Sequence, residues 1–236
     1  MGRPIKKGSP GIRLELGASV LSAARAVDTR LVKDRLDRFA GVHRTYVNAQ
    51  RKVDAAEAQL RAAQAHLAEC DAIQDEAVET LARALVADGQ PRGNPFDAFG
   101  APAPGTLTRL AFAEEAAAVH QLVAAVQRSK DISKATIQAA QAAEKAANIV
   151  EEELAPVEKL QETVRDARRT RDAVGQGWES ALAALRRGAR AAADEGAPDL
   201  YATLFPPVAR PVAKSKAPGE QAPTVPQTPT ETPTAA

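Results

Sequence analysis

The fold is decided by the stretch from Val32 to Leu85, which reads VKDRLDRFAGVHRTYVNAQRKVDAAEAQLRAAQAHLAECDAIQDEAVETLARAL. Every seventh residue from Val32 is apolar in seven of eight cases, and Gln74 is the exception. A companion series that starts at Val42 with the same spacing is apolar throughout and consists mostly of alanine. This heptad repeat predicts a long helix that packs against another long helix, and the strict spacing implies a left-handed supercoil. The first series comprises Val32, Phe39, Tyr46, Val53, Leu60, Leu67, Gln74 and Leu81.

The composition of the 236-residue chain favours a narrow helical seam over a thick globular core. Aromatic residues make up only 3%, and alanine, which forms helices readily but buries little area, dominates the 44% of apolar residues. The 31 basic and 30 acidic residues nearly cancel, so any affinity for nucleic acid or a membrane surface must be local. The bias toward arginine and alanine is typical of a GC-rich bacterial genome.

Membrane contact and secretion are not expected from this sequence. No run approaches the roughly 20 apolar residues that a spanning helix needs, and the basic N-terminal residues are not followed by the apolar run of a secretory signal. We therefore expect a cytoplasmic protein. The single cysteine, Cys70, excludes an internal disulfide, and its place in the alanine-rich series predicts a buried, inert thiol.

The N-terminal half divides into three segments. Residues 1–17 are rich in glycine, proline and basic side chains, which predicts a basic flexible arm. A first helix is expected from residues 18–87, with only a soft interruption near Asp28. Residues 88–106 hold four glycines and four prolines and are predicted to be a loop, whose two phenylalanines fold back to cap the end of the helices.

The C-terminal half is predicted to begin with a second long helix over residues 106–196, kinked or broken near Pro156. Residues 197–207 are predicted to form a short docking or partner-binding segment. Residues 208–236, rich in proline, threonine and alanine, are predicted to be disordered. The expected fold is all-α, a long antiparallel coiled-coil helical hairpin or a small helical bundle over residues 18–196, with disordered termini.

The short segment after the second helix concentrates aromatic residues in a chain that has few. Leu200 with Leu204, and Tyr201 with Phe205, are spaced four residues apart, so one or two helical turns would place them on adjoining faces. Two interpretations remain open. The segment docks onto the long helices, or it is a peptide that a protein partner binds.

Catalytic and metal-binding patterns are weak. His66, Glu69 and Cys70 share one helical face, but a metal site there would need further ligands and Cys70 belongs to the seam. The sequence has no glycine-rich phosphate loop and no nucleophile elbow. We therefore expect no enzyme activity, no cofactor and no metal. Trp178, the only tryptophan, lies on an apolar stripe and is predicted to be a core residue.

The N-terminal arm carries the one motif with a specific functional meaning. Gly2, Arg3 and Pro4, followed by Lys6 and Lys7, resemble the AT-hook, a short DNA-binding element with a Gly-Arg-Pro core flanked by basic residues. The resemblance implies that Arg3 enters the minor groove of A·T-rich DNA and that Lys6 and Lys7 contact phosphates. The basic residue that the family has before the glycine is missing, and the motif occurs once. A solvated basic N-terminus is the other interpretation.

Two functional hypotheses follow from the sequence. The first is a non-enzymatic structural, scaffold or adaptor protein that acts through coiled-coil and short-peptide contacts with protein partners or with copies of itself. The second is a DNA-associated protein that uses the basic arm, with the coiled coil as an oligomerisation module.

Overall fold

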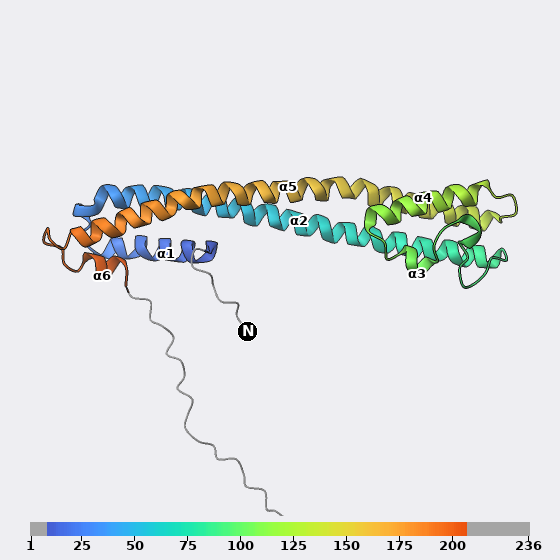
Figure 1. Ribbon diagram of the computed structural model, residues 1–236, viewed down its shortest axis with the longest axis horizontal. Coiled ribbons are helices and arrows are strands. Elements are labelled where there is room, and N and C mark those ends of the chain that lie inside the picture. Colours follow the sequence, from blue (N-terminus) through green and yellow to red (C-terminus); the bar gives the residue numbers. More distant parts are fainter. Residues whose placement is uncertain (1–8, 207–236) are drawn as a thin grey trace, which may run out of the picture. The chain divides into compact units, whose positions relative to one another are not determined.

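The structure of the chain, a computed structural model, describes residues 9–206. Every regular element in these residues is helical, which confirms the all-α prediction (Figure 1). Residues 1–8, which belong to the predicted arm, and residues 207–236, which include the predicted disordered tail, lie outside the described residues.

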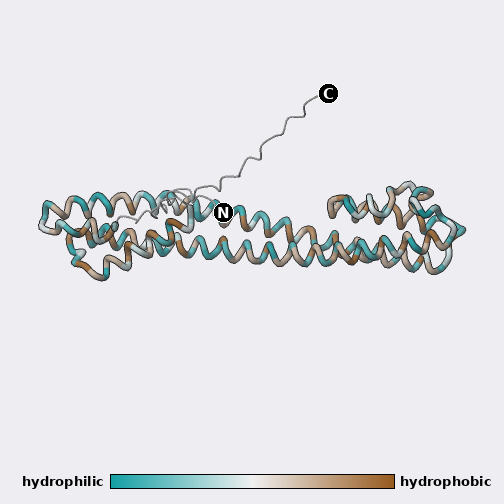
Figure 2. Tube along the Cα trace, turned by 90° about the horizontal axis from the view of Figure 1, so that it is seen from below, coloured by the Kyte–Doolittle hydropathy of each residue, from teal (hydrophilic) through white to brown (hydrophobic). Residues whose placement is uncertain are grey.

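Two long helices dominate the described chain. α2 spans Lys33–Ala87 with 55 residues, and α5 spans Lys134–Ala191 with 58 (Figure 1). At about 1.5 Å per residue each is roughly 80–90 Å long. They run antiparallel and pack along the predicted seam, where Phe39, Tyr46 and Leu81 are fully buried. Figure 2 shows hydrophobic residues recurring at intervals along both helices, as a narrow seam requires. The heptad prediction is confirmed, and the two helices pair within one chain.

The structure corrects the predicted N-terminal arm. α1 spans Pro10–Ala23 and therefore begins inside the segment, residues 1–17, that was expected to be flexible. Pro10 stands in the first helical turn, where its missing N–H removes no intrahelical hydrogen bond and its fixed φ suits a helix. Pro10 and Gly11 therefore mark the beginning of a helix rather than part of a helix-free arm.

The predicted continuous helix over residues 18–87 is also wrong. Two short 3₁₀ turns, η1 (Ala24–Ala26) and η2 (Arg30–Val32), reverse the chain, so α1 packs back against α2 instead of continuing into it. The Asp28 carboxylate accepts a hydrogen bond from the backbone N–H of Arg30 at 3.1 Å. Such a local bond offers the backbone an alternative to the helix, so the interruption near Asp28 is a full turn.

The predicted second helix is two helices. Instead of one helix over residues 106–196, the chain forms α4 (Phe112–Arg128), a break at residues 129–133, and then α5. α4 packs mainly against α5, and its buried residues share one hydrophobic core with those of α2 and α5, so this end of the pair contains three helices (Figure 1).

Hydrogen bonds between polar side chains and the backbone stabilise the break before α5. The Ser133 side chain accepts a hydrogen bond from the Thr136 backbone N–H at 3.2 Å, which caps α5. Asp88, the residue after α2, accepts bonds from the Ser133 N–H at 3.0 Å and from the Thr136 hydroxyl at 2.7 Å. These bonds lower the pKa of Asp88 and join the end of α2 to the start of α5.

The break predicted near Pro156 does not occur, because α5 continues through it. Pro156 is exposed, while Val150 and Val157 on either side of it are buried in the core. The proline costs one backbone hydrogen bond. Packing of the flanking apolar residues against α2 outweighs that loss.

The loop between α2 and α4 behaves largely as predicted. It contains η3 (Asp97–Phe99) and the single-turn α3 (Pro104–Leu107). Phe96 is fully buried and Phe99 packs against the same core, so the two phenylalanines cap this end of the helices.

The core is divided into two clusters at opposite ends of the α2–α5 pair. One is formed by α1, the first half of α2 and the last half of α5. The other is formed by α4, the last half of α2 and the first half of α5. Between them lies a stretch in which, among the described residues, α2 and α5 pack only against each other (Figures 1 and 2). We call this the central two-helix stretch, residues 51–66 and 157–170.

Candidate functional site

The predicted nucleic-acid-binding residues Arg3, Lys6 and Lys7 lie outside the described residues. The DNA-binding interpretation of the arm therefore stays a prediction.

The predicted partner-binding segment folds onto the long helices. It forms α6, Leu200–Leu204, which packs against α5 and α1. Leu200 is 4% exposed and Leu204 is fully buried, both within the cluster that contains α1. Of the two interpretations, docking onto the long helices or binding by a partner, docking is the one that fits Leu200 and Leu204.

Tyr201 and Phe205 remain half-buried, with their ring centroids 5.3 Å apart. Arg190 donates a hydrogen bond to the Tyr201 hydroxyl at 2.9 Å, and Arg186 stands 5.2 Å from the centroid of the Phe205 ring. Arg190 also lies 4.6 Å from the centroid of the Tyr201 ring, so a hydrogen bond and two cation–π contacts tie these aromatic residues to α5. They leave part of the aromatic surface in contact with solvent.

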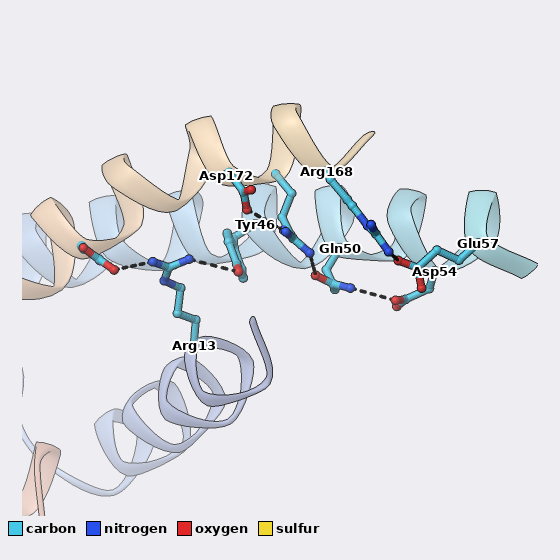
Figure 3. A network of polar contacts seen from close by, with 9 residues as sticks. Arg13, Tyr46, Gln50, Asp54, Glu57, Arg168 and Asp172 are labelled. Atoms are coloured by element: carbon cyan, nitrogen blue, oxygen red, sulfur yellow. Dashed lines mark hydrogen bonds and ion pairs between the residues drawn. The ribbon is translucent and has the colours of Figure 1, made fainter. Parts of the chain in front are cut away.

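A network of polar contacts runs along the α2–α5 pair from the α1 end toward the central two-helix stretch (Figure 3). Its first part connects three helices. Arg13 of α1 donates a hydrogen bond to the Tyr46 hydroxyl of α2 at 3.5 Å and forms an ion pair with Glu179 of α5. The arginine also lies over the Tyr46 ring. These contacts fix α1 on the pair.

The second part of the network joins α2 to α5. Arg171 donates a hydrogen bond to the Gln50 carbonyl oxygen at 3.3 Å, and the Gln50 amide donates to Asp54 at 2.8 Å (Figure 3). Further along, Arg168 donates two hydrogen bonds to one carboxylate oxygen of Glu57, at 2.7 and 3.1 Å. Cross-helix bonds of this kind set the register of two helices whose seam is mostly small residues.

A groove of about 330 Å³ opens on the central two-helix stretch. A second groove, of about 290 Å³, lies nearer to α1. Both have a polar rim and a narrow apolar floor, as expected where a two-helix seam is not covered by a third helix. The first groove is lined by Glu57, Leu60, Arg61, Gln161, Val164, Arg165 and Arg168.

The two halves of the described chain carry opposite net charge. The half with α1 and α6, residues 9–62 and 160–206, has 17 basic and 13 acidic side chains. The half with α4, residues 63–159, has 8 basic and 15 acidic side chains. Because the screening length is about 8–10 Å at physiological salt, the ends of helices this long act as separate charged surfaces. The near-zero net charge of the whole chain conceals this polarity.

The structure gathers His66 and Cys70 as their spacing predicts. The His66 ring lies 3.9 Å from the Cys70 sulfur and 3.7 Å from a carboxylate oxygen of Glu153 on α5. Cys70 is buried, as predicted, and burial raises the pKa of its thiol. Within residues 9–206, no three or more histidine, cysteine, aspartate or glutamate side chains are arranged to hold a metal ion.

Trp178 is a core residue, as predicted. It is 2% exposed and packs between Phe39 and Tyr46 of α2, with ring centroids 5.6 and 6.3 Å away. Its indole N–H donates a hydrogen bond to Nδ1 of His43 at 3.1 Å. Burial lowers the pKa of His43, which keeps the ring neutral and able to accept that bond.

One group of polar residues was not anticipated from the sequence. Asp71, Gln74 and Asp75 of α2 lie near Glu115 of α4, and Gln74 and Glu115 are almost completely buried. The polar residue in an otherwise apolar heptad series, Gln74, was the signal for this site. Nothing in the pattern around Glu115 marks it as a buried acid, because its neighbours in sequence are mostly alanine.

No protein-family model, curated protein or solved structure matches this chain. The helices of residues 9–206 are too short or too polar to span a lipid bilayer.

Proposed function

We propose that this chain is a non-enzymatic scaffold or adaptor protein that binds protein partners, or further copies of itself, through its coiled-coil surface. The observation that supports this most is the central two-helix stretch. It leaves a groove between α2 and α5 with an apolar floor and charged rims. Two-helix seams of this kind accept a further helix readily.

The length and polarity of the helices support a spacing role. The helix pair is roughly 80–90 Å long. Each of its ends has its own hydrophobic core, completed by α1 at one end and by α4 at the other. One half is net positive and the other net negative. Charged surfaces of opposite sign select different partners and orient them, so the chain can hold two binding surfaces at a fixed distance.

Residues with reactive side chains have structural partners, which supports a non-enzymatic role. The His43 ring accepts a hydrogen bond from Trp178, and Cys70 is a buried thiol with a raised pKa. A raised thiol pKa reduces the thiolate fraction that nucleophilic chemistry needs. A free buried thiol also fits the reducing cytoplasm, where we place this protein.

The test is an affinity capture from lysate that compares two charge-reversed variants of the tagged chain. Arg61→Glu with Arg165→Glu changes exposed residues that line the groove. Arg38→Glu with Arg187→Glu, two exposed residues outside it, makes the same change in net charge. We expect the groove variant to lose bound partner at least tenfold and the control variant to retain it, with both lysates treated with nuclease.

Equal capture by both variants would contradict a role for the groove. If only the tagged chain is recovered, the same two variants are compared for self-association, measured by light scattering of the purified proteins. Circular dichroism of each variant must match that of the wild type, since exposed substitutions normally change stability by less than about 0.5 kcal/mol.

A second candidate function is DNA association through the N-terminal arm. The arm resembles an AT-hook and leads into α1, which belongs to the net-positive half of the described chain. Under this alternative, changing Arg3, Lys6 and Lys7 to alanine weakens binding to A·T-rich duplex DNA and makes the slope of log affinity against log salt shallower by about 2–3. Fluorescence anisotropy at several salt concentrations measures both. An unchanged affinity and slope would exclude the arm.

A further inference from the structure

Four polar side chains, two of them almost completely buried, lie together where the start of α4 meets α2. They are Asp71, Gln74 and Asp75 of α2 and Glu115 of α4, and we call them the α4 polar cluster. Gln74 is 0% exposed and Glu115 is 1% exposed. Both side-chain polar atoms of Gln74, and one carboxyl oxygen from each of the three acids, are buried without a hydrogen-bond partner. Burying a polar atom without a hydrogen-bond partner destabilises the folded state. The number of such atoms at this one contact therefore needs an explanation.

The charges around Glu115 are all acidic. Burial is the largest cause that raises the pKa of Glu115, from 4.5 to about 7, and the carboxylates of Asp75 and Asp71 raise it further. The neighbouring Gln74 side chain lowers the pKa of Glu115, but by less than burial raises it. Glu115 also stands in the first turn of α4, where the helix dipole favours a carboxylate, so its protonation reflects its enclosure by α2.

α5, the other long helix packed against α4, brings its charges to other positions. Glu151 of α5 lies 3.5 Å from His120, and Glu144 of α5 lies 3.5 Å from Gln127. Both contacts are further along α4 than Glu115. The charged groups that act on Glu115 are therefore the two aspartates of α2.

The rest of the α4 contact is apolar and favours docking at any pH. The buried face of α4 includes Ala116, Val119, Leu122, Val123 and Val126. α4 is joined to the rest of the chain by two non-helical links, residues 108–111 and 129–133. Such a helix can move away from α2 and α5 without unfolding either of them.

We propose that α4 is a pH-sensitive latch: a proton held in the α4 polar cluster keeps α4 on α2, and its loss releases α4. The protonated carboxyl of Glu115 carries no charge toward Asp71 and Asp75, whereas the ionised form places a buried negative charge beside these two half-buried aspartates. Release exposes the apolar faces of α4 and of the helix pair beneath it, which a helical partner can then bind. This latch acts at the acidic end and does not depend on the proposed role of the central groove.

The direction of the pH effect follows from linkage. A carboxyl whose pKa is higher in the docked state than in the released state stabilises docking most at low pH, and that stabilisation is lost as the pH rises through about 7. With values of about 7 docked and 4.5 released, raising the pH from about 5.5 to 8.5 weakens docking about 30-fold.

Hydrogen–deuterium exchange of the full-length protein measures this directly. The protection of peptides from α4, corrected for the intrinsic effect of pH, is compared at pH 5.5 and 8.5 with peptides from the last turns of α5. We expect wild-type α4 to lose about 30-fold in protection while the α5 peptides change little. Glu115→Gln should keep α4 protected at both pH values. Glu114→Gln, at the neighbouring exposed residue, should behave as the wild type.

Three results would overturn the latch. The first is protection of wild-type α4 that does not depend on pH, and the second is a pH dependence that persists in Glu115→Gln. The third comes from adding calcium or magnesium at pH 8.5: restored protection in the wild type but not in Glu115→Gln would make the cluster a cation site instead. Asp75→Asn provides an independent check. Removing this negative neighbour lowers the pKa of Glu115 in the docked state, so α4 should lose less than the wild type's 30-fold in protection between pH 5.5 and 8.5.

Discussion

Replacing Trp178 with alanine lowers the free energy of unfolding by about 3–5 kcal/mol, the range found for large aromatic residues removed from a core. Trp178 is 2% exposed and packs against Phe39 and Tyr46. Its removal leaves a cavity in the cluster that holds α1 on the helix pair. It also takes away the donor to His43, a buried ring that then has an unpaired nitrogen.

Denaturant unfolding followed by far-ultraviolet circular dichroism measures this loss, since the variant has no tryptophan to report fluorescence. Trp178→Phe keeps most of the packing and removes the N–H donor, so a smaller loss, of about 1–2 kcal/mol, is expected. Ile73→Ala is the matched control, because Ile73 is 61% exposed and its truncation should cost less than about 0.5 kcal/mol. If Trp178→Ala and Ile73→Ala unfold at the same denaturant concentration, Trp178 is not a core residue.

The pairing of the long helices could be predicted because it depends on residues that recur in sequence. The heptad series that includes Phe39, Tyr46 and Leu81 is buried in the structure as the spacing requires. A seam of this kind is a local pattern repeated many times, so a few exceptions do not obscure it. Even Gln74, the exception, occupies a buried position.

The folding back of α1 and α4 could not be predicted in the same way. Each reversal depends on a few polar bonds: Asp28 with the Arg30 backbone at one end, and Asp88 with Ser133 and Thr136 at the other. Ser133 and Thr136 also fit the heptad spacing, so the pattern favoured a continuous helix. The partner that makes Ser133 a helix start, Asp88, lies 45 residues earlier in the chain. Pairings across such distances are fixed by the fold and are invisible to local spacing.

The α4 polar cluster combines both situations. Gln74 interrupts an apolar series and so is visible in the sequence, whereas Glu115 becomes a buried acid only because α4 folds back onto α2. A prediction that treats α4 and α5 as one helix has no reason to bring Glu115 near Asp71 and Asp75. The site therefore follows from the same break at residues 129–133 that the sequence pattern concealed.

Replacing Gly17 with alanine should destabilise the protein by about 1–3 kcal/mol, although alanine normally favours a helix over glycine. A Cβ atom at Gly17 of α1 would stand 2.2 Å from Nδ1 of His43 on α2. That ring cannot move aside freely, because the same nitrogen accepts the hydrogen bond from Trp178. α1 must then move away from α2, or the His43–Trp178 bond must break.

The matched control is Gly41→Ala, in the interior of α2, where a Cβ atom would meet nothing within 4 Å. That change should stabilise the protein by about 0.5–1 kcal/mol, because it lowers the entropy of the unfolded chain without a clash. Opposite signs for the same substitution at two helical glycines would show that Gly17 is required for the close approach of α1 to α2. A gain in stability at both positions would mean that α1 is not held against His43, and the reversal of the chain between α1 and α2 would then be in doubt.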